Sequence, residues 1–361
     1  MFLTLLFLLL GLVLLVSGAE ALVRGASRLA RALGVSSLVV GLTVVAMGTS
    51  SPELAVSVQS ALSGQADIAL GNIIGSNIFN ILVILGLSAL IAPLFVAQQI
   101  VRLDVPVMLA ISFGVFLMAS DGVLRRAEGL LLLAVLALYI LWLIRLSRRE
   151  QAAVLAEYEE AFGDGNNRTA RFWVMQIALV AGGLVMLAVG SRLLVDSAVA
   201  IAQVLGVSEL VIGLTIVAAG TSLPEVATSV VATLRGERDI AVGNVIGSNT
   251  FNLLGVLGLS SLVAPQALPV APAMLSFDLP VMIGVALACL PIFFTGHLIA
   301  RWEGALFLAY YAAYMAYLLL AAQRHDLLDT YAMAMATVVL PLTAVTLAVF
   351  AARHWRARRQ D

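Results

Sequence analysis

Apolar runs of about 20 residues follow one another along almost the whole chain, separated by short polar stretches. A helix of about 20 apolar residues crosses the roughly 30 Å hydrocarbon core of a bilayer. Strands of a membrane barrel would instead alternate apolar and polar residues over about 10 positions. The pattern predicts an all-α polytopic membrane protein. The expected spans are residues 3–22, 36–63, 67–93, 103–120, 127–146, 172–194, 208–235, 239–265, 277–296, 301–321 and 331–350.

One polar pattern occurs twice in this apolar background. Gly-Thr-Ser-Ser-Pro-Glu ends at Glu53 and Gly-Thr-Ser-Leu-Pro-Glu at Glu225, while Gly-Asn-x-Ile-Gly-Ser-Asn-x-Phe-Asn ends at Asn80 and again at Asn252. Every match has the same offset of 172 residues, with 34 identities in the 53 positions that align 41–93 with 213–265. Helix packing requires only apolar residues, yet most identities are Gly, Ser, Thr, Asn, Pro or Glu. The repetition therefore indicates a paired functional site.

The repeat also predicts the architecture. Residues 1–146 and 172–321 are expected to be two copies of one five-helix unit, separated by a polar cytoplasmic loop at 147–171. Because five is odd, the second copy must enter the membrane in the opposite orientation, which makes the repeats inverted. Residues 322–361 are expected to add an eleventh transmembrane helix and a basic cytoplasmic tail to the ten-helix core.

Composition and charge agree with a membrane location. The chain is 62% hydrophobic and 11% charged, with a mean hydropathy of +1.06, which leaves too few charges to cover a soluble surface. All 20 basic residues are arginine, and an outside N-terminus with eleven spans places sixteen of them inside and four outside. The positive-inside rule thus predicts a multi-pass inner (plasma) membrane protein with its C-terminus in the cytoplasm. No basic face outside the tail supports nucleic-acid binding.

Two prolines mark the candidate chemistry. Pro52 and Pro224 interrupt predicted spans, and a break inside a membrane is tolerated where it lines a cavity. Each break should expose carbonyls and place hydroxyls beside one carboxylate, Glu53 or Glu225. Two ionised carboxylates that meet in a low dielectric repel unless they are protonated or bridged by a cation. The hydroxyls concerned are those of Thr49, Ser50, Thr221 and Ser222.

The second motif supplies further oxygen ligands. Ser76 and Asn80 are four residues apart and so share one helix face, as do Ser248 and Asn252. All of these candidates are oxygen donors, which select hard cations: Ca²⁺ accepts 6–8 oxygens, Na⁺ fits similar ones, and Mg²⁺ retains its water. No cofactor is expected. Nor is an enzyme, because a serine hydrolase would need a suitably placed His or Lys base.

The doubled motifs resemble the α-repeats of the sodium/calcium exchanger branch of the Ca²⁺/cation antiporter superfamily, over roughly residues 1–321. The resemblance implies that Glu53 and Glu225 bind both Ca²⁺ and Na⁺, with added oxygens from Thr49 and Thr221. It implies that flanking Na⁺ sites are formed by Ser76, Ser248 and the backbones of Ala46 and Ala218. It also implies that Asn80 and Asn252 occupy the central position. Potassium-dependent relatives carry Asp at the Asn252 position, so Asn argues against K⁺ use.

The expected function is therefore that of a secondary antiporter that exchanges Na⁺ for Ca²⁺ by alternating access, with the monomer as functional unit. Residues 1–34 and 172–206 are expected to slide against the motif-bearing helices. Two alternatives remain open. Protons could replace Na⁺ as counter-ion, although the proton-coupled relatives carry an acidic residue within the Gly-Asn helix that is absent here. A passive cation channel is the other alternative.

Overall fold

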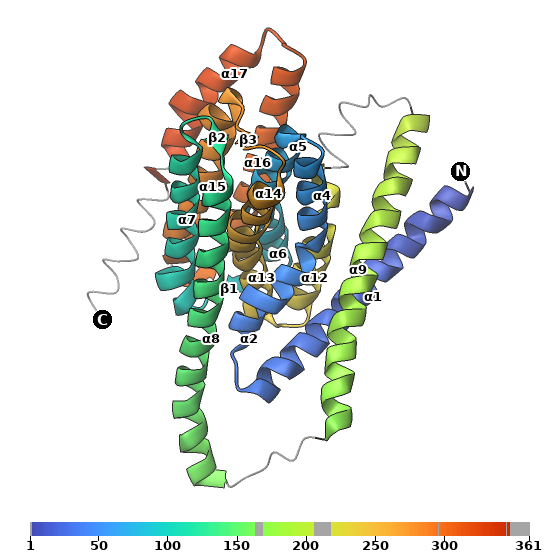
Figure 1. Ribbon diagram of the computed structural model, residues 1–361, viewed down its shortest axis with the longest axis vertical. Helices are drawn as coiled ribbons and strands as arrows, with labels where there is room; N and C mark the ends of the chain where they lie inside the picture. The colour runs from blue at the N-terminus through green and yellow to red at the C-terminus, as the bar shows by residue number, and fades with distance from the viewer. Residues whose placement is uncertain (1, 163–168, 206–217, 295, 344, 347–361) are drawn as a thin grey trace.

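The computed structural model describes residues 2–162, 169–205, 218–294, 296–343 and 345–346 and is built almost entirely of helices (Figure 1). Within these residues, eight helices are long and apolar enough to cross a membrane, or nine if the bent pair Ser37–Thr49 and Ser51–Leu62 forms one span. The shorter apolar helices Leu223–Leu234 and Leu328–Thr343 lie at two further predicted spans. The all-α polytopic fold is confirmed, whereas the count of ten helices plus an eleventh is not.

The first repeat runs from a long tilted helix to a long final one. Its elements are α1 (Phe2–Leu33), α2 (Ser37–Val40), α3 (Ala46–Thr49), α4 (Ser51–Leu62), α5 (Ala66–Phe79), α6 (Gly86–Ile91), β1 (Leu94–Phe95), α7 (Val105–Ala119), β2 (Val123–Leu124) and α8 (Arg126–Phe162).

The second repeat follows the same order. Its elements are α9 (Ala170–Val204), α11 (Ala218–Gly220), α12 (Leu223–Leu234), α13 (Arg238–Phe251), α14 (Leu257–Val263), β3 (Leu268–Pro269), α15 (Leu279–Phe294), β4 (Leu298–Ile299) and α16 (Arg301–Ala322), after which α17 (Leu328–Ala334) begins.

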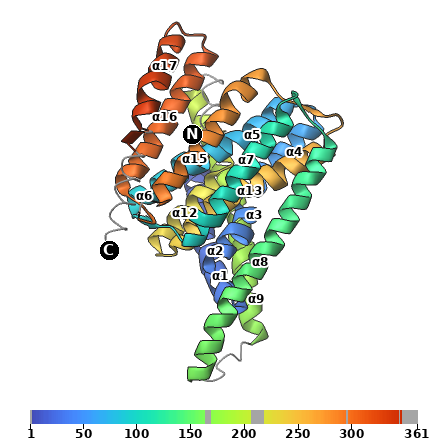
Figure 2. The same cartoon turned by 90° about the vertical axis from the view of Figure 1, so that its left-hand side faces the viewer.

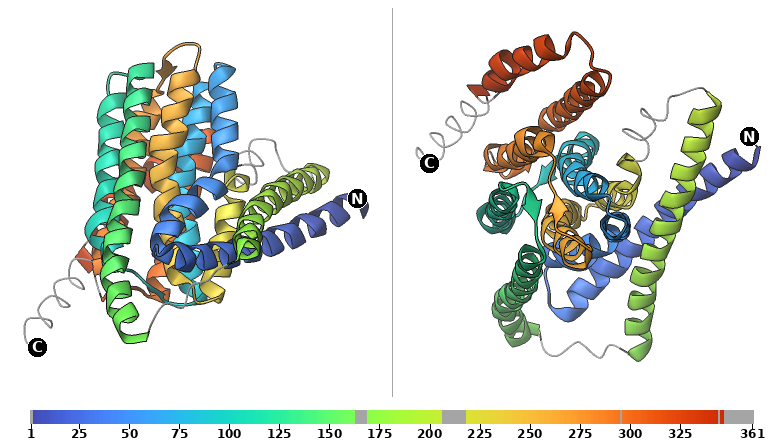
Figure 3. Two further views of the ribbon diagram at one scale, coloured as in Figure 1. Left: turned by 60° about the horizontal axis from the view of Figure 1, so that its bottom comes forward. Right: turned by 45° about the horizontal axis from the view of Figure 1, so that its top comes forward.

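Equivalent parts of the two repeats pack against each other in opposite directions. Strand β1 pairs antiparallel with β4, and β3 pairs antiparallel with β2. The first helices, α1 and α9, also cross in antiparallel fashion, because Gly11 lies against Gly190 and Gly18 against Gly183. Figure 3 shows this pair lying across the upright bundle formed by the other helices. These reciprocal contacts are those of an inverted repeat.

Short π-helical turns break the regular α-helical pattern at equivalent places. One occupies Asn80–Leu85 and its counterpart Asn252–Val256; a second pair occupies Ile100–Asp104 and Met274–Asp278. A π-turn inserts one extra residue into a helix and often accompanies a functional site. The first pair begins at Asn80 and Asn252, two of the candidate site residues.

Two segments differ from expectation. The polar segment predicted as a loop from Ser147 continues α8 as far as Phe162, because it is rich in Ala, Glu and Arg and contains no Gly or Pro before Gly163. At the other end, the helix expected over 331–350 already begins at Leu328, where α17 starts. The apolar helix Leu328–Thr343 packs beside α16 (Figure 2), and the Tyr310 hydroxyl bonds with that of Thr343 at 2.5 Å. The arginines of the expected basic tail, Arg353, Arg356, Arg358 and Arg359, lie outside the described residues.

The α1–α9 contact yields a stability prediction with a control in the neighbouring residue. A Cβ on Gly183 would lie 2.7 Å from the Gly18 carbonyl oxygen, whereas one on Gly182 would meet nothing within 4 Å. Either change to alanine by itself favours the helical backbone by about 1 kcal/mol, because alanine has a higher helix propensity than glycine. We expect Gly183→Ala to destabilise the fold by roughly 1–3 kcal/mol and Gly182→Ala not to destabilise it. Thermal unfolding in detergent measures both, and equal melting temperatures would contradict the close contact.

Candidate cation site

Each candidate glutamate lies just after a break in its helix. The chain bends by 47° between Ser37–Thr49 and Ser51–Leu62, and Ser50 and Ser222 have ψ values of 11° and 7°. Pro52 and Pro224 then occupy the first turns of α4 and α12, where a missing N–H costs no hydrogen bond. Glu53 and Glu225 lie in the same first turns, where the positive end of the helix dipole favours a carboxylate.

The two glutamates are fully buried and bonded across the repeats. Ser50 Oγ donates to Glu225 Oε1 at 2.8 Å, and Ser222 Oγ donates to Glu53 Oε1 at 2.8 Å. All four side chains have 0% exposure. Each carboxylate is therefore bonded to the serine that precedes the other carboxylate in sequence, which brings both acids to one site.

Asparagines link the two breaks at a second level. Asn72 Nδ2 donates to Ser57 Oγ at 2.9 Å and to the Glu53 carbonyl at 3.3 Å, while its Oδ1 accepts from Thr221 Oγ1 at 3.2 Å. The same network is repeated in the other half, at distances of 3.0, 3.5 and 3.1 Å, by Asn244, Ser229, Glu225 and Thr49. The backbone beside each acid is thus tied to the threonine of the opposite repeat.

A second pair of asparagines, at a third level, joins α5 to α13. Asn77 Nδ2 donates to the Asn249 carbonyl at 3.3 Å, and Asn249 Nδ2 donates to the Asn77 carbonyl at 3.2 Å. Their side-chain oxygens accept from Asn252 Nδ2 at 3.1 Å and Asn80 Nδ2 at 3.0 Å, respectively. These bonds occupy the amide nitrogens of Asn80 and Asn252 and leave the amide oxygens available.

Six buried oxygens of the candidate residues have no hydrogen-bond partner within the described part of the chain. An unpaired buried polar group costs about 1–3 kcal/mol, so six of them call for a ligand. All six are oxygens with lone pairs, as a hard cation requires. They form three mirrored pairs: Glu53 Oε2 and Glu225 Oε2, Ser76 Oγ and Ser248 Oγ, and Asn80 Oδ1 and Asn252 Oδ1.

Packing places these pairs around the breaks. The π-helical turn that begins at Asn80 contacts α12, which carries Glu225, and the turn that begins at Asn252 contacts α4, which carries Glu53. The turn that carries the asparagine of one repeat therefore lies beside the helix that carries the carboxylate of the other.

The remaining predicted residues differ in how they are placed. Thr49 is buried and Thr221 half-buried, and both donate to the asparagines described above. The Ala46 carbonyl already accepts from Ser50 N at 3.0 Å and Thr49 Oγ1 at 3.3 Å. Ala218 begins α11; residues 206–217 before it lie outside the described residues.

Sequence reasoning missed several members of the network. Ser50 and Ser222, expected only near the site, bond directly to the glutamates. The asparagines and serines of the second and third levels were not selected, although each is identical in both repeats at the offset of 172. They are Ser57, Asn72, Asn77, Ser229, Asn244 and Asn249.

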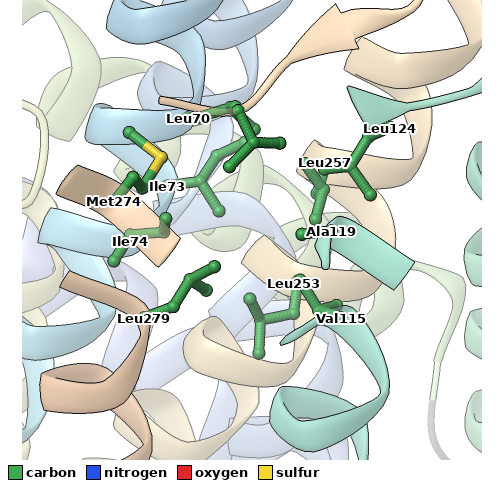
Figure 4. Close-up of a pocket in the computed structure, with 11 residues that line it drawn as sticks. Leu70, Ile73, Ile74, Val115, Ala119, Leu124, Leu253, Leu257, Met274 and Leu279 are labelled. Carbon is green, nitrogen blue, oxygen red and sulfur yellow. The ribbon is translucent and has the colours of Figure 1, made fainter. Parts of the chain in front are cut away.

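Other parts of the described chain offer no comparable cation site. Among the described residues no three His, Cys, Asp or Glu side chains cluster as metal ligands. A cavity of about 10 Å³ beside α5 is lined only by apolar side chains, among them Ile73, Leu253 and Met274 (Figure 4). That space is at the lower limit for a single water molecule and lacks polar partners.

The chain resembles known proteins over most of its length. It is 40% identical over 285 residues to the inner membrane protein YrbG of Escherichia coli (78% of this chain, 85% of YrbG). It is 34% identical over 340 residues to the sodium/calcium exchanger MaX1 of Methanosarcina acetivorans (86% of this chain, 97% of MaX1).

A solved structure of the sodium-calcium exchanger NCX_Mj superposes with a TM-score of 0.75 and 34% identity, over 88% of this chain and 99% of that one. The profile of the family described as sodium/calcium exchanger protein matches residues 3–145 and 175–320, so these two segments, together with the mirrored oxygen-lined site between them, show that the chain belongs to the sodium/calcium exchanger family.

Proposed function

We propose that the chain is a secondary active antiporter that exchanges Na⁺ for Ca²⁺ across the inner membrane by alternating access. The observation that carries this proposal is the set of six unpaired buried oxygens, contributed equally by the two repeats and including both carboxylates. MaX1 and NCX_Mj, named as exchangers of these two ions, support the same assignment.

Charge explains why the two ions would exclude each other. Glu53 and Glu225 carry at most two negative charges, which one Ca²⁺ neutralises. In the alternative loaded state, several Na⁺ ions would neutralise the same two carboxylates. Burial of the empty, doubly charged pair is costly in a low dielectric, so the carrier would change state only when loaded. That coupling separates an antiporter from a leak.

We assign the ligands in the same mirrored pairs. Glu53 and Glu225 with Thr49 and Thr221 would hold Ca²⁺. Ser76 and Ser248, with the carbonyls of Ala46 and Ala218, would hold Na⁺ on either side, and Asn80 and Asn252 would lie between. For the Ala46 carbonyl to bind a cation, the hydrogen bond from Thr49 Oγ1 must be released, because both of its lone pairs are in use.

Alternating access would come from movement of the α1–α9 pair across the bundle. Helix α9 covers both breaks, since Leu184 lies against Gly48 and Val195 against Gly220. The close glycine contacts would let α1 and α9 move as a unit. With the N-terminus outside, the arginine distribution favours a cytoplasmic C-terminus, and the complete site within one chain supports a monomeric transporter.

Loss of either carboxylate should abolish most transport. Glu53→Gln and Glu225→Gln each remove a charged ligand worth about 1.5–3 kcal/mol, so ⁴⁵Ca²⁺ uptake into Na⁺-loaded proteoliposomes should fall at least about tenfold. Glu303→Gln is the matched control: Glu303 is also buried, but it accepts the Ala300 N–H at 2.7 Å at the start of α16. Wild-type uptake by either site variant would exclude the mechanism.

The counter-ion can be determined by imposing one gradient at a time. Uptake of ⁴⁵Ca²⁺ should follow an outward Na⁺ gradient at fixed pH and should not respond to a K⁺ gradient, because Asn occupies position 252. Uptake driven by an outward H⁺ gradient without Na⁺ would instead establish proton coupling. Single-channel conductance in a planar bilayer would establish a channel.

Neighbouring serines separate a role at the site from a general helix effect. Ser50→Ala removes the hydrogen bond to Glu225 Oε1, whereas exposed Ser51 bonds only to the Met47 carbonyl, at 3.2 Å. A buried carboxylate that loses its donor holds its charge less well, so half-saturating Ca²⁺ should rise about tenfold in Ser50→Ala. Ser51→Ala should match wild type. Equal Ca²⁺ dependence of the two variants would contradict the crossed hydrogen bonds.

A further inference from the structure

A second cavity, unlike the first, is polar and lies where α1 meets the turn between α12 and α13. Its volume is about 220 Å³. Its walls come from both repeats: one face of α1 and the connection that follows α12. The lining residues are Val23, Arg24, Ser27, Arg28, Arg31, Arg235 and Glu237.

The cavity is strongly basic, and ion pairs hold two of its arginines in place. Glu20 forms ion pairs with both Arg24 and Arg235, whose Nε donates to Glu20 Oε2 at 2.8 Å. One carboxylate thus fixes two guanidinium groups, one from each repeat. Four arginines against Glu20 and Glu237 leave a net charge of +2. Within the described part of the chain, Arg28 has no carboxylate at ion-pair distance.

A buried donor completes the lining. Ser27 is 3% exposed, and its hydroxyl has no hydrogen-bond partner among the described residues. The hydroxyl and the exposed guanidinium groups around it make donors more numerous than acceptors toward the cavity, where Glu237 contributes the one carboxylate among the lining residues. Phosphate oxygens accept several such bonds, and arginine binds them in a bidentate manner that lysine does not reproduce.

The internal repeat does not carry these residues. At the offset of 172, arginines 24, 28, 31 and 235 correspond to Asp196, Ala200, Gln203 and Ser63, and Ser27 corresponds to Val199. No arginine occupies the mirrored positions, and among the described residues α9 does not pack on α4 as α1 packs on α12. The basic cavity is thus a feature of one end of the protein.

We propose that this cavity is a binding site for a phosphate-bearing anion, distinct from the cation site. The anion would be the headgroup of an anionic phospholipid or a soluble phosphate. Basic pockets at the ends of membrane helices are suited to anionic headgroups, and the volume matches a headgroup. Because the walls come from both repeats, the bound anion stabilises the contact between α1 and the α12–α13 turn.

Thermal unfolding of the purified full chain in a neutral detergent tests the site. The probes are dioleoyl phosphatidylglycerol, dioleoyl phosphatidylcholine and inorganic phosphate. Phosphatidylglycerol should raise the melting temperature in a saturable manner, and phosphatidylcholine should not. A rise with inorganic phosphate at least as large would identify the soluble anion as the ligand. No rise with either anion would overturn the proposal.

Three variants distinguish the site from general charge effects. Arg28→Gln should weaken the apparent affinity about tenfold. Ser27→Ala should weaken it about fivefold without lowering the melting temperature of the ligand-free protein, since it removes an unpaired buried hydroxyl. The control is Arg192→Gln, because Arg192 is an exposed arginine of the mirrored ion pair with Asp196. An equal loss of apparent anion affinity in Arg192→Gln would overturn the proposal. Because the readout is the melting temperature, the result does not depend on the transport activity proposed above.

Discussion

The burial of two carboxylates at one place in the membrane is the constraint on which this structure depends. Each carboxylate lies at the positive end of a broken helix and takes one hydrogen bond from a serine of the opposite repeat. These contacts satisfy one oxygen of each acid and leave the other unpaired. The asparagine network around them holds the two helix breaks in register through side chains of both repeats. In the proposed function a cation bonds to these unpaired oxygens.

Much of the fold and part of the site could be predicted from the sequence, because the repeat occurs at a constant offset. The offset makes Glu53 and Glu225 equivalent, and the odd number of spans makes the repeats inverted. It does not say which copy each side chain contacts: Ser50 was expected beside Glu53, yet it bonds to Glu225. Asn72 and Asn77 were missed for the same reason, since their amides act across the repeat boundary. The π-helical turn at Asn80 depends on packing and leaves no periodic signal in the sequence. The segment after Ser147 was predicted as a loop because it is polar, although it continues α8.

Symmetry is closest at the centre and is lost toward the ends. The hydrogen bonds of the glutamates and asparagines are mirrored pair by pair. Farther out, Tyr139 bonds to Asp104 and Tyr314 to Asp278, still as equivalents. One contact of α9 has no such counterpart: Ser191 Oγ bonds to the Gly220 carbonyl at 2.7 Å, and the mirrored position holds Ala19. A symmetric centre with unequal surroundings suits a carrier whose site is to be exposed to either side in turn, while the basic cavity serves only one end.

Crystals of the protein soaked with Ca²⁺ at low Na⁺ would test the central claim most directly. The account predicts one strong peak of density, about 2.3–2.6 Å from carboxylate oxygens of both Glu53 and Glu225, that disappears when Na⁺ is raised. A peak that contacts only one of the two glutamates, or one that lies elsewhere and persists at high Na⁺, would contradict a shared site.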